Sequence, residues 1–523
     1  QSPHDQYYFK HPALMVAGQV AAPRIDLANE DLVRSHVQAV WLSESGMSLG
    51  GSMGQVLDLS SIEKPTPVLV DSIRDDLSNA HTQLSARGSA QAVLNSVREQ
   101  FDNATWWSDD WLELVLKGLP TAFTAAAQRW WDMYRQACTQ RDSYNAIISD
   151  HTRAADEKKR ARRLRDEAEK RIELLVAESG NFSQHDFDPY RYFAAEGFLP
   201  GYSFPRLPIS AYIPGRRGRA DGEYLQRARF LAVSEFGPRS LIYHEGSRYR
   251  ITKVDLPVVA ANSDDPDNLV TSKAKRCVAC GYLHPIGQES ADVCDYCGTE
   301  LEGPSRDLFR LQNVTTRRQD QINSDEEERQ RQGYELITGF RFAEREHHLS
   351  RRRATIAGAD GTDFGNLVYA PTATLWRLNL GWRRRKDRNQ HGFVLDLNFG
   401  TWAKNDEQAD DSDTAASADD KLTARTRRVI PYVDDTRNVL VIEPFTPLPI
   451  ETMASVESAL KRAIQIEFQL EESELASEPL PSTSERTALL FYESAEGGAG
   501  VLRQLISDPA ALDRVVRVAI VIC

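Results

Sequence analysis

The sequence predicts an α+β protein of several domains, with a helical part that carries a charged arm, a β-rich body with a zinc knuckle, and a terminal α/β domain. The first observation is length, because 523 residues exceed what one hydrophobic core serves and suggest roughly three or four domains. The second is a change of pattern near residue 181, from helical periodicity to segments rich in Gly, Pro, aromatic and β-branched residues. The third is a repeated Cys-x-x-Cys-Gly motif in the β-rich part.

Composition excludes some classes of protein. Hydrophobic residues make up 41% and charged residues 27%, which is ordinary for a water-soluble globular chain. No apolar run reaches the roughly 20 residues that span a bilayer, so we expect a cytoplasmic protein without a membrane partner. The net charge of -13 argues against nucleic-acid binding by the whole surface but leaves room for local basic segments.

The two ends and the missing motifs bear on catalysis. The chain starts at Gln1 without an initiator Met or a signal-peptide pattern, and it stops inside the apolar run Leu512 to Cys523, so we expect a fragment of a longer polypeptide. It contains no G-x-x-x-x-G-K-[S/T] motif and no strand followed by paired carboxylates. No catalytic residue is predicted, and whether the chain is an enzyme stays open.

The N-terminal third is predicted to be helical. Residues 1–60 are expected to form a linker with one helix from Asn29 to Leu42, for which Asn29 is a suitable N-cap. Residues 61–190 are expected to form a helical domain. Their tryptophans have helical spacing, which favours core packing. These tryptophans are Trp106, Trp107, Trp111, Trp130 and Trp131.

A charged arm is predicted within this helical domain. Residues 153–171 alternate cations with carboxylates at i+3 and i+4 spacing, which favours a solvated helical hairpin. A nucleic-acid contact by its basic centre is the alternative. The cations are Lys158, Lys159, Arg160, Arg162, Arg163 and Arg165.

The rest of the chain divides into five segments. Residues 191–265 form the first part of the β-rich domain, with a hairpin at 241–254, and residues 266–305 form the zinc knuckle. Residues 306–404 form the second part, with strands at 336–342 and 374–380. Residues 405–424 are expected to be an acidic disordered loop, because they hold many Asp and no aromatic residue. Residues 425–523 form a truncated α/β domain with strands at 438–442 and 487–492 and helices at 450–471 and from 501 onward.

Four cysteines predict one structural zinc site. Cys277 and Cys280 form the first Cys-x-x-Cys-Gly turn, and Cys294 and Cys297 form the second, with thirteen residues between them. Two such turns can direct four thiolates at one tetrahedral ion, which leaves no position for water or substrate. Such a zinc stabilises a fold and does not catalyse. Two disulfides or a redox pair are the alternatives, which a chain with only two further cysteines does not favour.

A glycine-rich turn follows the last predicted strand. Glu493 precedes Gly497-Gly498-Ala499-Gly500, and a helix starts at Val501. Backbone amides at that helix start could bind a phosphate, but the Lys and Ser/Thr of a nucleotide loop are missing, so close strand-to-helix packing is favoured.

A basic strand end supplies the candidate DNA contacts. Trp382 could stack on an unpaired base, and the arginines after it could pair with phosphates, whereas Trp376 alternates to the core side. Two further clusters could join the same surface. A solvated positive face or a site for an acidic partner is the alternative. The strand-end cluster is Arg383, Arg384, Arg385 and Arg388, and the others are Arg351, Arg352 and Arg353, and Arg216, Arg217 and Arg219.

Several blocks resemble one helicase family. Tyr8-Phe9 with His11-Pro12, Arg24 to Asn29, and Ser234 to Pro238 resemble the region after the motor in bacterial superfamily 2 helicases of the mitomycin-repair-factor type. Tyr492-Glu493 with Gly497 to Gly500 resembles the signature of their terminal domain. Within that group, Ala28 to His36 and Trp376 to Arg385 are most similar to the helicase component of the DISARM anti-phage system.

The resemblance implies an ATP-driven translocase that acts on DNA beside a second protein subunit. ATP and magnesium would then bind to motor domains that are absent from this span, and Cys523 would be an orphaned ligand of a further cysteine cluster. We therefore expect a C-terminal region that guides DNA, with a single-stranded portion, behind the motor. The alternative is a non-enzymatic, zinc-containing scaffold that assembles a defence or DNA-repair complex.

Overall fold

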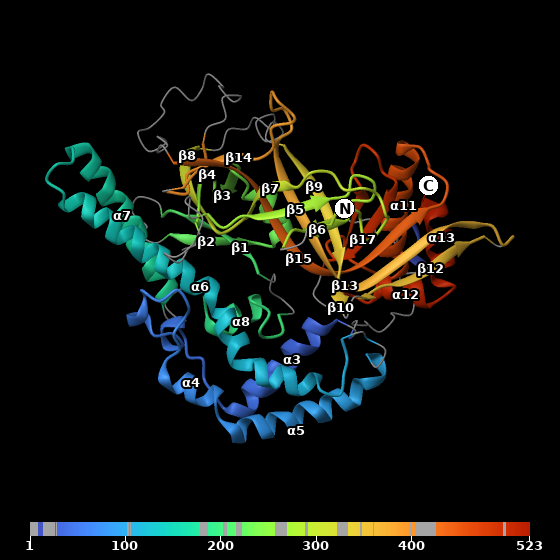
Figure 1. Ribbon diagram of the computed structural model, residues 1–523, viewed down its shortest axis with the longest axis horizontal. Helices are drawn as coiled ribbons and strands as arrows, with labels where there is room; N and C mark the ends of the chain where they lie inside the picture. The colour runs from blue at the N-terminus through green and yellow to red at the C-terminus, as the bar shows by residue number, and fades with distance from the viewer. Residues whose placement is uncertain are drawn as a thin grey trace.

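The computed structural model has a helical part along one side of two β-sheets (Figure 1). It describes residues 9–13, 27, 29–101, 104, 106–177, 187–201, 207–215, 222–256, 269–287, 291–321, 333–345, 348–358, 360–397, 399–403, 425–494 and 498–522. Three of the predicted features lie outside these residues. They are the acidic loop at 405–424, the basic cluster Arg216, Arg217 and Arg219, and Cys523.

The first long helix begins where its capping residue predicts. Asn29 caps α3 (Glu30–Ser45), and its side-chain oxygen accepts a hydrogen bond from the Leu32 nitrogen at 3.2 Å. This confirms the predicted helix and its start. The helical part also contains α4 (Asp71–Leu77), α5 (Ala80–Val97), α6 (Trp111–Ser149), α7 (Ala155–Val176), α8 (Pro189–Ala195) and the 3-10 turns η1 (Met53–Gln55), η2 (Leu59–Ser61) and η3 (Arg98–Gln100).

Tryptophans form the centre of this helical part, as their spacing predicts. Trp130 and Trp131 are fully buried, Trp106 and Trp111 are nearly so, and Trp107 packs against the same core. Each large ring removes much apolar area from water, so this cluster supplies a large share of the stability of the helical part.

Helices α6 and α7 form a long antiparallel hairpin, the predicted charged arm (Figure 1). Its base is tied to the β-rich body by a buried ion pair, in which Arg171 Nη2 lies 3.0 Å from both carboxylate oxygens of Asp255. The arm therefore lies against the body at its base and is not solvated along its whole length.

The first sheet has five strands in the order β2-β1-β8-β4-β3. The predicted hairpin at 241–254 is confirmed as β3 (Leu241–His244) and β4 (Ser247–Val254). The other strands are β1 (Ile209–Ile213), β2 (Glu223–Arg227) and β8 (Val314–Gln321), and helix α9 (Arg229–Glu235) follows β2.

The second sheet has ten strands and is built on two very long ones. Strand β13 (Asp363–Trp382) pairs with β15 (Thr426–Pro444) in antiparallel register, with Leu378 opposite Tyr432. The sequence predicted only the most apolar piece of each. The remaining strands are β5 (Ser272–Arg276), β6 (Leu283–Pro285), β7 (Ser305–Arg310), β9 (Tyr334–Phe342), β12 (Arg352–Ala357), β14 (Phe393–Asp396), β16 (Leu475–Leu480) and β17 (Ala488–Glu493), beside a small ribbon of β10 (Glu344–Arg345) and β11 (His348–Leu349).

The C-terminal segment does not form a separate sheet. Strand β17 pairs with β15, and β16 pairs with β17, so both extend the ten-stranded sheet across the expected boundary at residue 425. Helices α11 (Ile450–Glu467), α12 (Val501–Ser507) and α13 (Ala511–Ile522) bury their apolar sides against this sheet and against each other. The α+β class is confirmed. In the part of the chain described, no helix has the length and hydropathy to cross a membrane.

Candidate zinc centre and nucleic-acid interface

The four predicted cysteines meet at one point. All four sulfurs lie within 4.8 Å of one another, with Cys277 Sγ 3.5 Å from Cys297 Sγ and Cys280 Sγ 3.7 Å from Cys294 Sγ. A tetrahedral zinc ion with Zn–S bonds of about 2.3 Å separates its sulfurs by about 3.8 Å, so these distances fit the ion. They are far longer than the roughly 2.05 Å of a disulfide, and the thiols are free.

The backbone of the two turns explains the glycines of the motif. The nitrogen of Gly281 donates to the Cys277 oxygen, and that of Gly298 donates to the Cys294 oxygen, both at 2.9 Å. Both glycines have φ 77°, a left-handed conformation that other residues adopt only at a cost. The motif therefore encodes two equal turns that point their thiols inward.

His284 supports the cysteine cluster, and sequence reasoning missed it. The ring is 4% exposed, its Nε2 lies 3.4 Å from Cys294 Sγ, and its Nδ1 lies 3.3 Å from a carboxylate oxygen of Asp295. The hydrogen bond with Cys280, aided by that with His284, lowers the pKa of the Cys294 thiol, and the same bond raises the pKa of Cys280, so Cys294 is the member of this pair that loses its proton first. A thiolate is the form that binds metal, so this environment suits a zinc ligand.

The knuckle packs directly on the ten-stranded sheet. Tyr282 stacks on Tyr296 with ring centroids 5.5 Å apart, and Tyr282 meets Phe340 of β9 edge-on at 5.2 Å. Cys277 and Cys294 belong to the same buried cluster as these rings. A zinc ion bound here would therefore fix one end of the sheet as well as the knuckle itself.

Trp382 is part of the core, which contradicts the expected base stacking. The side chain is only 5% exposed, and its ring stacks on Tyr334 with centroids 4.5 Å apart and meets Phe393 edge-on. Alternation alone places Trp382 on the side of Trp376, and the register shift between Asn379 and Gly381 moves it to the opposite face. The expectation fails because that face is covered too, by Tyr334 and Phe393. The Trp382 ring is thus closed to a nucleic-acid base.

The strand-end arginines divide into one buried and three exposed residues. Arg385 is 9% exposed and pairs with Glu335 at 2.6 Å while donating to the Trp382 oxygen at 3.0 Å, so it closes the turn and is not available to DNA. Arg383 is exposed, although its Nε donates to the Tyr334 oxygen at 2.9 Å. Arg384 and Arg388 are exposed.

The second arginine cluster lies at the other end of β13. Arg352 of β12 is paired with Tyr369 of β13. Tyr369 lies thirteen residues before Trp382 in β13, which separates the two positions by roughly 40 Å along the strand. Arg351 lies 5.4 Å from the centre of the Tyr296 ring beside the knuckle, and Arg353 lies 3.4 Å from Glu443. The two clusters therefore do not join in one surface, contrary to what we expected.

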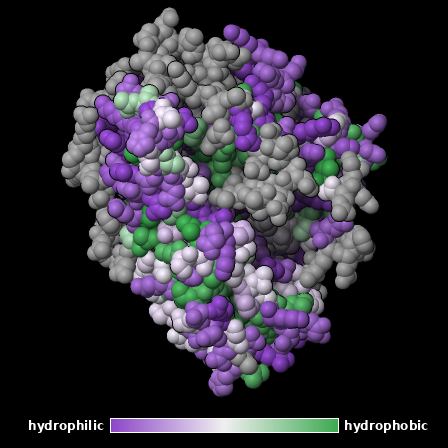
Figure 2. All heavy atoms as spheres, turned by 60° about the vertical axis from the view of Figure 1, so that its left-hand side comes forward, coloured by the Kyte–Doolittle hydropathy of each residue, from purple (hydrophilic) through white to green (hydrophobic). Residues whose placement is uncertain are grey.

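A different set of cations converges in a groove between α7 and the five-stranded sheet. The groove has a volume of about 560 Å³, and we call it the arm groove. Figure 2 turns this side of the molecule forward, where hydrophilic side chains gather beside apolar patches. Five cations line the groove beside one carboxylate, Glu167. They are Arg160, Arg163, Lys253, Arg317 and Arg318.

Strand pairing increases the positive charge next to the arm groove. Arg250 of β4 stands directly opposite Arg317 of β8. Like charges at directly paired positions repel one another, so this arrangement lowers the stability of the sheet unless anions compensate it. Thr252, Thr315 and Thr401 add hydroxyl groups to the lining. Arginine, lysine and hydroxyl side chains are the usual contacts to nucleic-acid phosphates.

The glycine turn is already filled by a protein carboxylate. Glu493 is 1% exposed, and its Oε1 accepts hydrogen bonds from the nitrogens of Val501 at 2.7 Å and Leu502 at 3.2 Å. These are the amides that a phosphate would need at the start of α12. The structure thus supports the favoured close packing over a phosphate site.

Comparison with known proteins finds one matching family model and one similar solved structure. Residues 456–523 match the family described as the MrfA Zn-binding domain. The knuckle cysteines lie before this segment, but the first turn of the knuckle contacts it, since Thr487 Oγ1 lies 3.4 Å from the Ala279 oxygen. No curated protein matches the chain. The crystal structure of the DUF1998 helicase MrfA bound to DNA aligns with this chain at 8% identity and a TM-score of 0.27. The alignment covers 67% of this chain and 37% of the MrfA chain, so this chain spans little more than a third of the length of MrfA in that structure.

Proposed function

We propose that this chain is the DNA-guiding C-terminal region of an ATP-dependent superfamily 2 helicase or translocase, and that the arm groove is its DNA track. The observation that carries the proposal is the excess of five cations over one carboxylate in the arm groove of a chain whose net charge is -13. The match of residues 456–523 to the MrfA Zn-binding domain supports the helicase context. ATP and magnesium would act in motor domains outside this chain.

The lining indicates how the arm groove would hold DNA. Its described residues include no aromatic side chain, so contacts would be made to phosphates and would be independent of sequence. The adjoining hollow of about 190 Å³ shares Arg160 and Lys253 and adds Arg153, just before α7, together with Glu157. Its lining also includes Tyr144 and Phe399, so it is less basic and more apolar than the arm groove. The single-stranded portion expected from the sequence stays a prediction.

Binding of labelled single-stranded and duplex DNA across a salt series tests the proposal. The variant R163Q/R317Q/R318Q removes three charges from the arm groove, and R384Q/K386Q/R388Q removes three exposed charges at the end of β13 as a matched control. Each lost phosphate contact should reduce the slope of log K against log salt by about 1. Unchanged affinity and slope in the first variant would overturn the arm groove as the DNA track.

A scaffold function is the second candidate, and an exposed apolar patch favours it. Phe364, Phe445, Leu448 and Ile450 are 57%, 52%, 40% and 43% exposed at the ends of β13, β15 and α11. A partner subunit that covers this patch should bind with little salt dependence, unlike DNA. The anti-phage role follows only from the resemblance to DISARM helicases. Loss of protection against phage when the parent protein carries the arm-groove variant would support it.

A further inference from the structure

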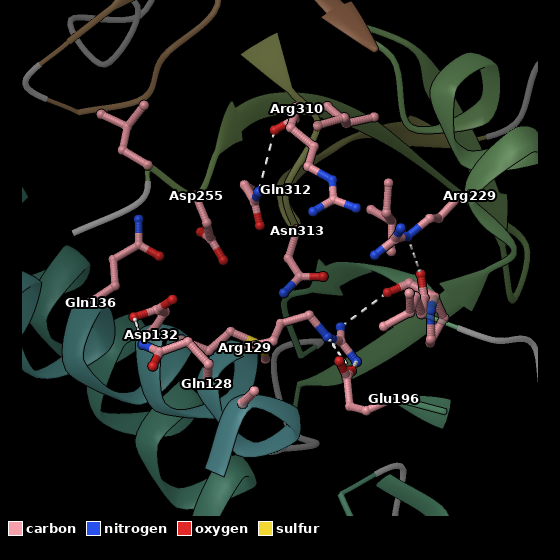
Figure 3. A pocket seen from close by; sticks show the side chains of 17 residues that line it. Gln128, Arg129, Asp132, Gln136, Glu196, Arg229, Asp255, Arg310, Gln312 and Asn313 are labelled. Carbon is pink, nitrogen blue, oxygen red and sulfur yellow. Dashed lines mark hydrogen bonds and ion pairs between the residues drawn. The ribbon is translucent and has the colours of Figure 1, made fainter. Parts of the chain in front are cut away.

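A second cavity lies where the helical part meets the β-rich body, and the DNA track does not use it. It has a volume of about 330 Å³, within the range of small-molecule sites. One face of α6 forms its floor, and α9 and the turn between β7 and β8 form its roof (Figure 3). We call it the junction cavity.

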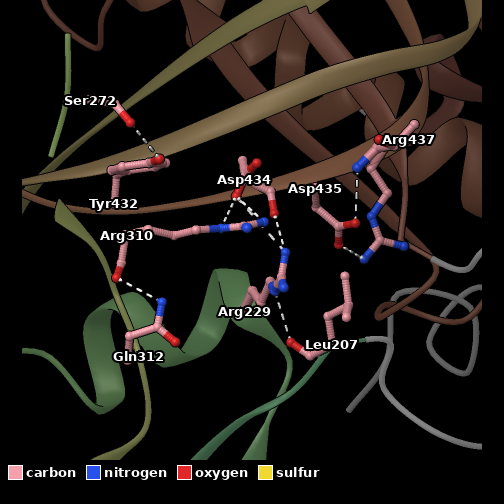
Figure 4. A network of polar contacts seen from close by, with 10 residues as sticks. Leu207, Arg229, Ser272, Arg310, Gln312, Tyr432, Asp434, Asp435 and Arg437 are labelled. Carbon is pink, nitrogen blue, oxygen red and sulfur yellow. Dashed lines mark hydrogen bonds and ion pairs between the residues drawn. The ribbon is translucent and has the colours of Figure 1, made fainter. Parts of the chain in front are cut away.

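Two arginines on one wall of the junction cavity share a single counter-charge. Arg310 Nη2 lies 2.8 Å from Asp434 Oδ1, while Arg229 Nη1 lies 3.9 Å from that oxygen and donates to the Asp434 backbone oxygen at 3.0 Å (Figure 4). The neighbouring pair is Arg437 with Asp435, at 2.5 Å. On this wall three guanidinium groups thus face two carboxylates. Elsewhere in the lining Arg129 pairs with Glu196 and Asp255 pairs with Arg171, and Asp132 adds one carboxylate on the opposite wall.

This arrangement lowers the pKa of Arg229. Its side chain is only 13% exposed, and burial together with the charge of Arg310 lowers its pKa to about 10. At neutral pH it remains charged. A partly buried guanidinium beside a second one is stabilised by anions, and Asp434, Asp435 and Glu196 offset the lowering of the Arg229 pKa only in part.

A buried amide adds a donor to the same space. Asn313 is 4% exposed and lines the cavity, and its Oδ1 accepts a hydrogen bond from the Ser210 nitrogen at 2.8 Å. That bond fixes the oxygen on the protein side. Figure 3 shows the Nδ2 group directed into the cavity, where no described residue is recorded as its acceptor.

We propose that the junction cavity binds a phosphate group, held by the guanidinium groups of Arg229 and Arg310 and by the side-chain amide of Asn313. Arg229 already donates from Nε and Nη1 to backbone oxygens of Leu207 and Asp434, and Arg310 donates from Nε and Nη2 to Asp434 Oδ1. The remaining donors, Arg229 Nη2, Arg310 Nη1 and Asn313 Nδ2, come from different directions, which suits the oxygens of a tetrahedral anion. The ligand is inorganic phosphate or the phosphate of a nucleoside monophosphate, because both present the same oxygens.

The opposite wall restricts what can be attached to that phosphate. Asp132 and Asp255 face the cavity from the other side. The Asp255 carboxylate is paired with Arg171, and Asp132 Oδ1 accepts a hydrogen bond from Gln128, so the carboxylate of Asp132 is the group that would repel a second anionic group. A monophosphate is therefore preferred over a di- or triphosphate.

Calorimetric titration of the whole chain with inorganic phosphate, and separately with adenosine monophosphate, tests this site in a buffer free of other oxyanions and of DNA. We expect one saturable site. Arg310 is 47% exposed, so R310Q should fold, and its affinity should fall about tenfold or more, which equals about 1.4 kcal/mol. R310K keeps the charge without the fork and should be intermediate. R306Q, which removes an exposed arginine from the same strand, should bind as the wild type does.

The outcomes separate this proposal from that for DNA. Tighter binding of the monophosphate identifies a nucleotide site, and equal binding identifies a free-phosphate site. Absence of phosphate binding by the wild type, or equal affinity in R310Q and the wild type, overturns the proposal. The arm-groove variant R163Q/R317Q/R318Q leaves the junction cavity intact and should bind phosphate normally even where it loses DNA.

Discussion

The carboxylate of Glu493 accepts a hydrogen bond from the backbone nitrogen of Val501 at 2.7 Å, so the last residue of β17 caps the first turn of α12. Its second oxygen accepts from Asn438 Nδ2 of β15 at 2.9 Å. A Cβ at Gly498 would lie 1.7 Å from that carboxylate. The glycine is therefore required because the buried carboxylate occupies the space beside it, and a ligand-binding role is not needed to explain it.

Replacing Glu493 by Ala should loosen α12 locally. The change leaves the buried nitrogens of Val501 and Leu502 without an acceptor, which costs roughly 1–3 kcal/mol for each unsatisfied group. Hydrogen exchange of residues 498–507 should become faster by the corresponding factor, whereas α3 should be unaffected. Glu472→Ala, an exposed carboxylate before β16, is the control and should leave exchange unchanged. Equal protection in both variants would contradict the capping role.

The sequence predicts local structure far better than it predicts the interface. Asn29 and the Cys-x-x-Cys-Gly turns are read correctly because their hydrogen bonds join residues within a few positions of each other. Trp382 is misread because the rings that cover it, Tyr334 of β9 and Phe393 of β14, come from distant parts of the sequence. Arg317 was not predicted to join Arg160 because only the packing of α7 on the five-stranded sheet brings the two together.

The zinc site predicts a distinct response of two cysteine variants. Cys294→Ser should abolish stoichiometric zinc, because a hydroxyl is a poor replacement for a thiolate in a site of four sulfurs. Cys138→Ser, at a buried cysteine of α6 outside the cluster, should retain one zinc per chain by elemental analysis. The first variant should also unfold at a lower temperature, since the knuckle shares a core with the ten-stranded sheet. One full equivalent of zinc in Cys294→Ser would rule out this centre.

Removing one member of the buried pair Arg171 and Asp255 should lower the free energy of unfolding strongly, whereas replacing both members by apolar residues should lower it little. Their side chains are 6% and 9% exposed, so Asp255→Leu leaves a buried guanidinium without its partner, at a cost of about 3–5 kcal/mol. The double variant Arg171→Met/Asp255→Leu removes both charges and should recover most of that loss. Urea unfolding of both single variants and the double variant measures the coupling. Simple additivity would mean that the pair does not hold the arm to the body.

Replacing either of two aspartates of the helical part should change the pH dependence of stability, in opposite directions. Burial raises the pKa of Asp132 above its ordinary value, and hydrogen bonds from Ser60 and Ser61 lower that of Asp58. A carboxyl whose pKa is raised in the folded state stabilises the protein below about pH 4, and this stabilisation is lost as pH rises through the folded-state pKa. Asp132→Asn lacks this loss, so its stability relative to the wild type should increase as pH rises. A lowered pKa gives stability that is present above about pH 4, so Asp58→Asn should lose relative stability over the same range. Thermal unfolding of both variants between about pH 3.5 and 7 should show the two differences diverging, and parallel curves would show that neither carboxylate has the environment described.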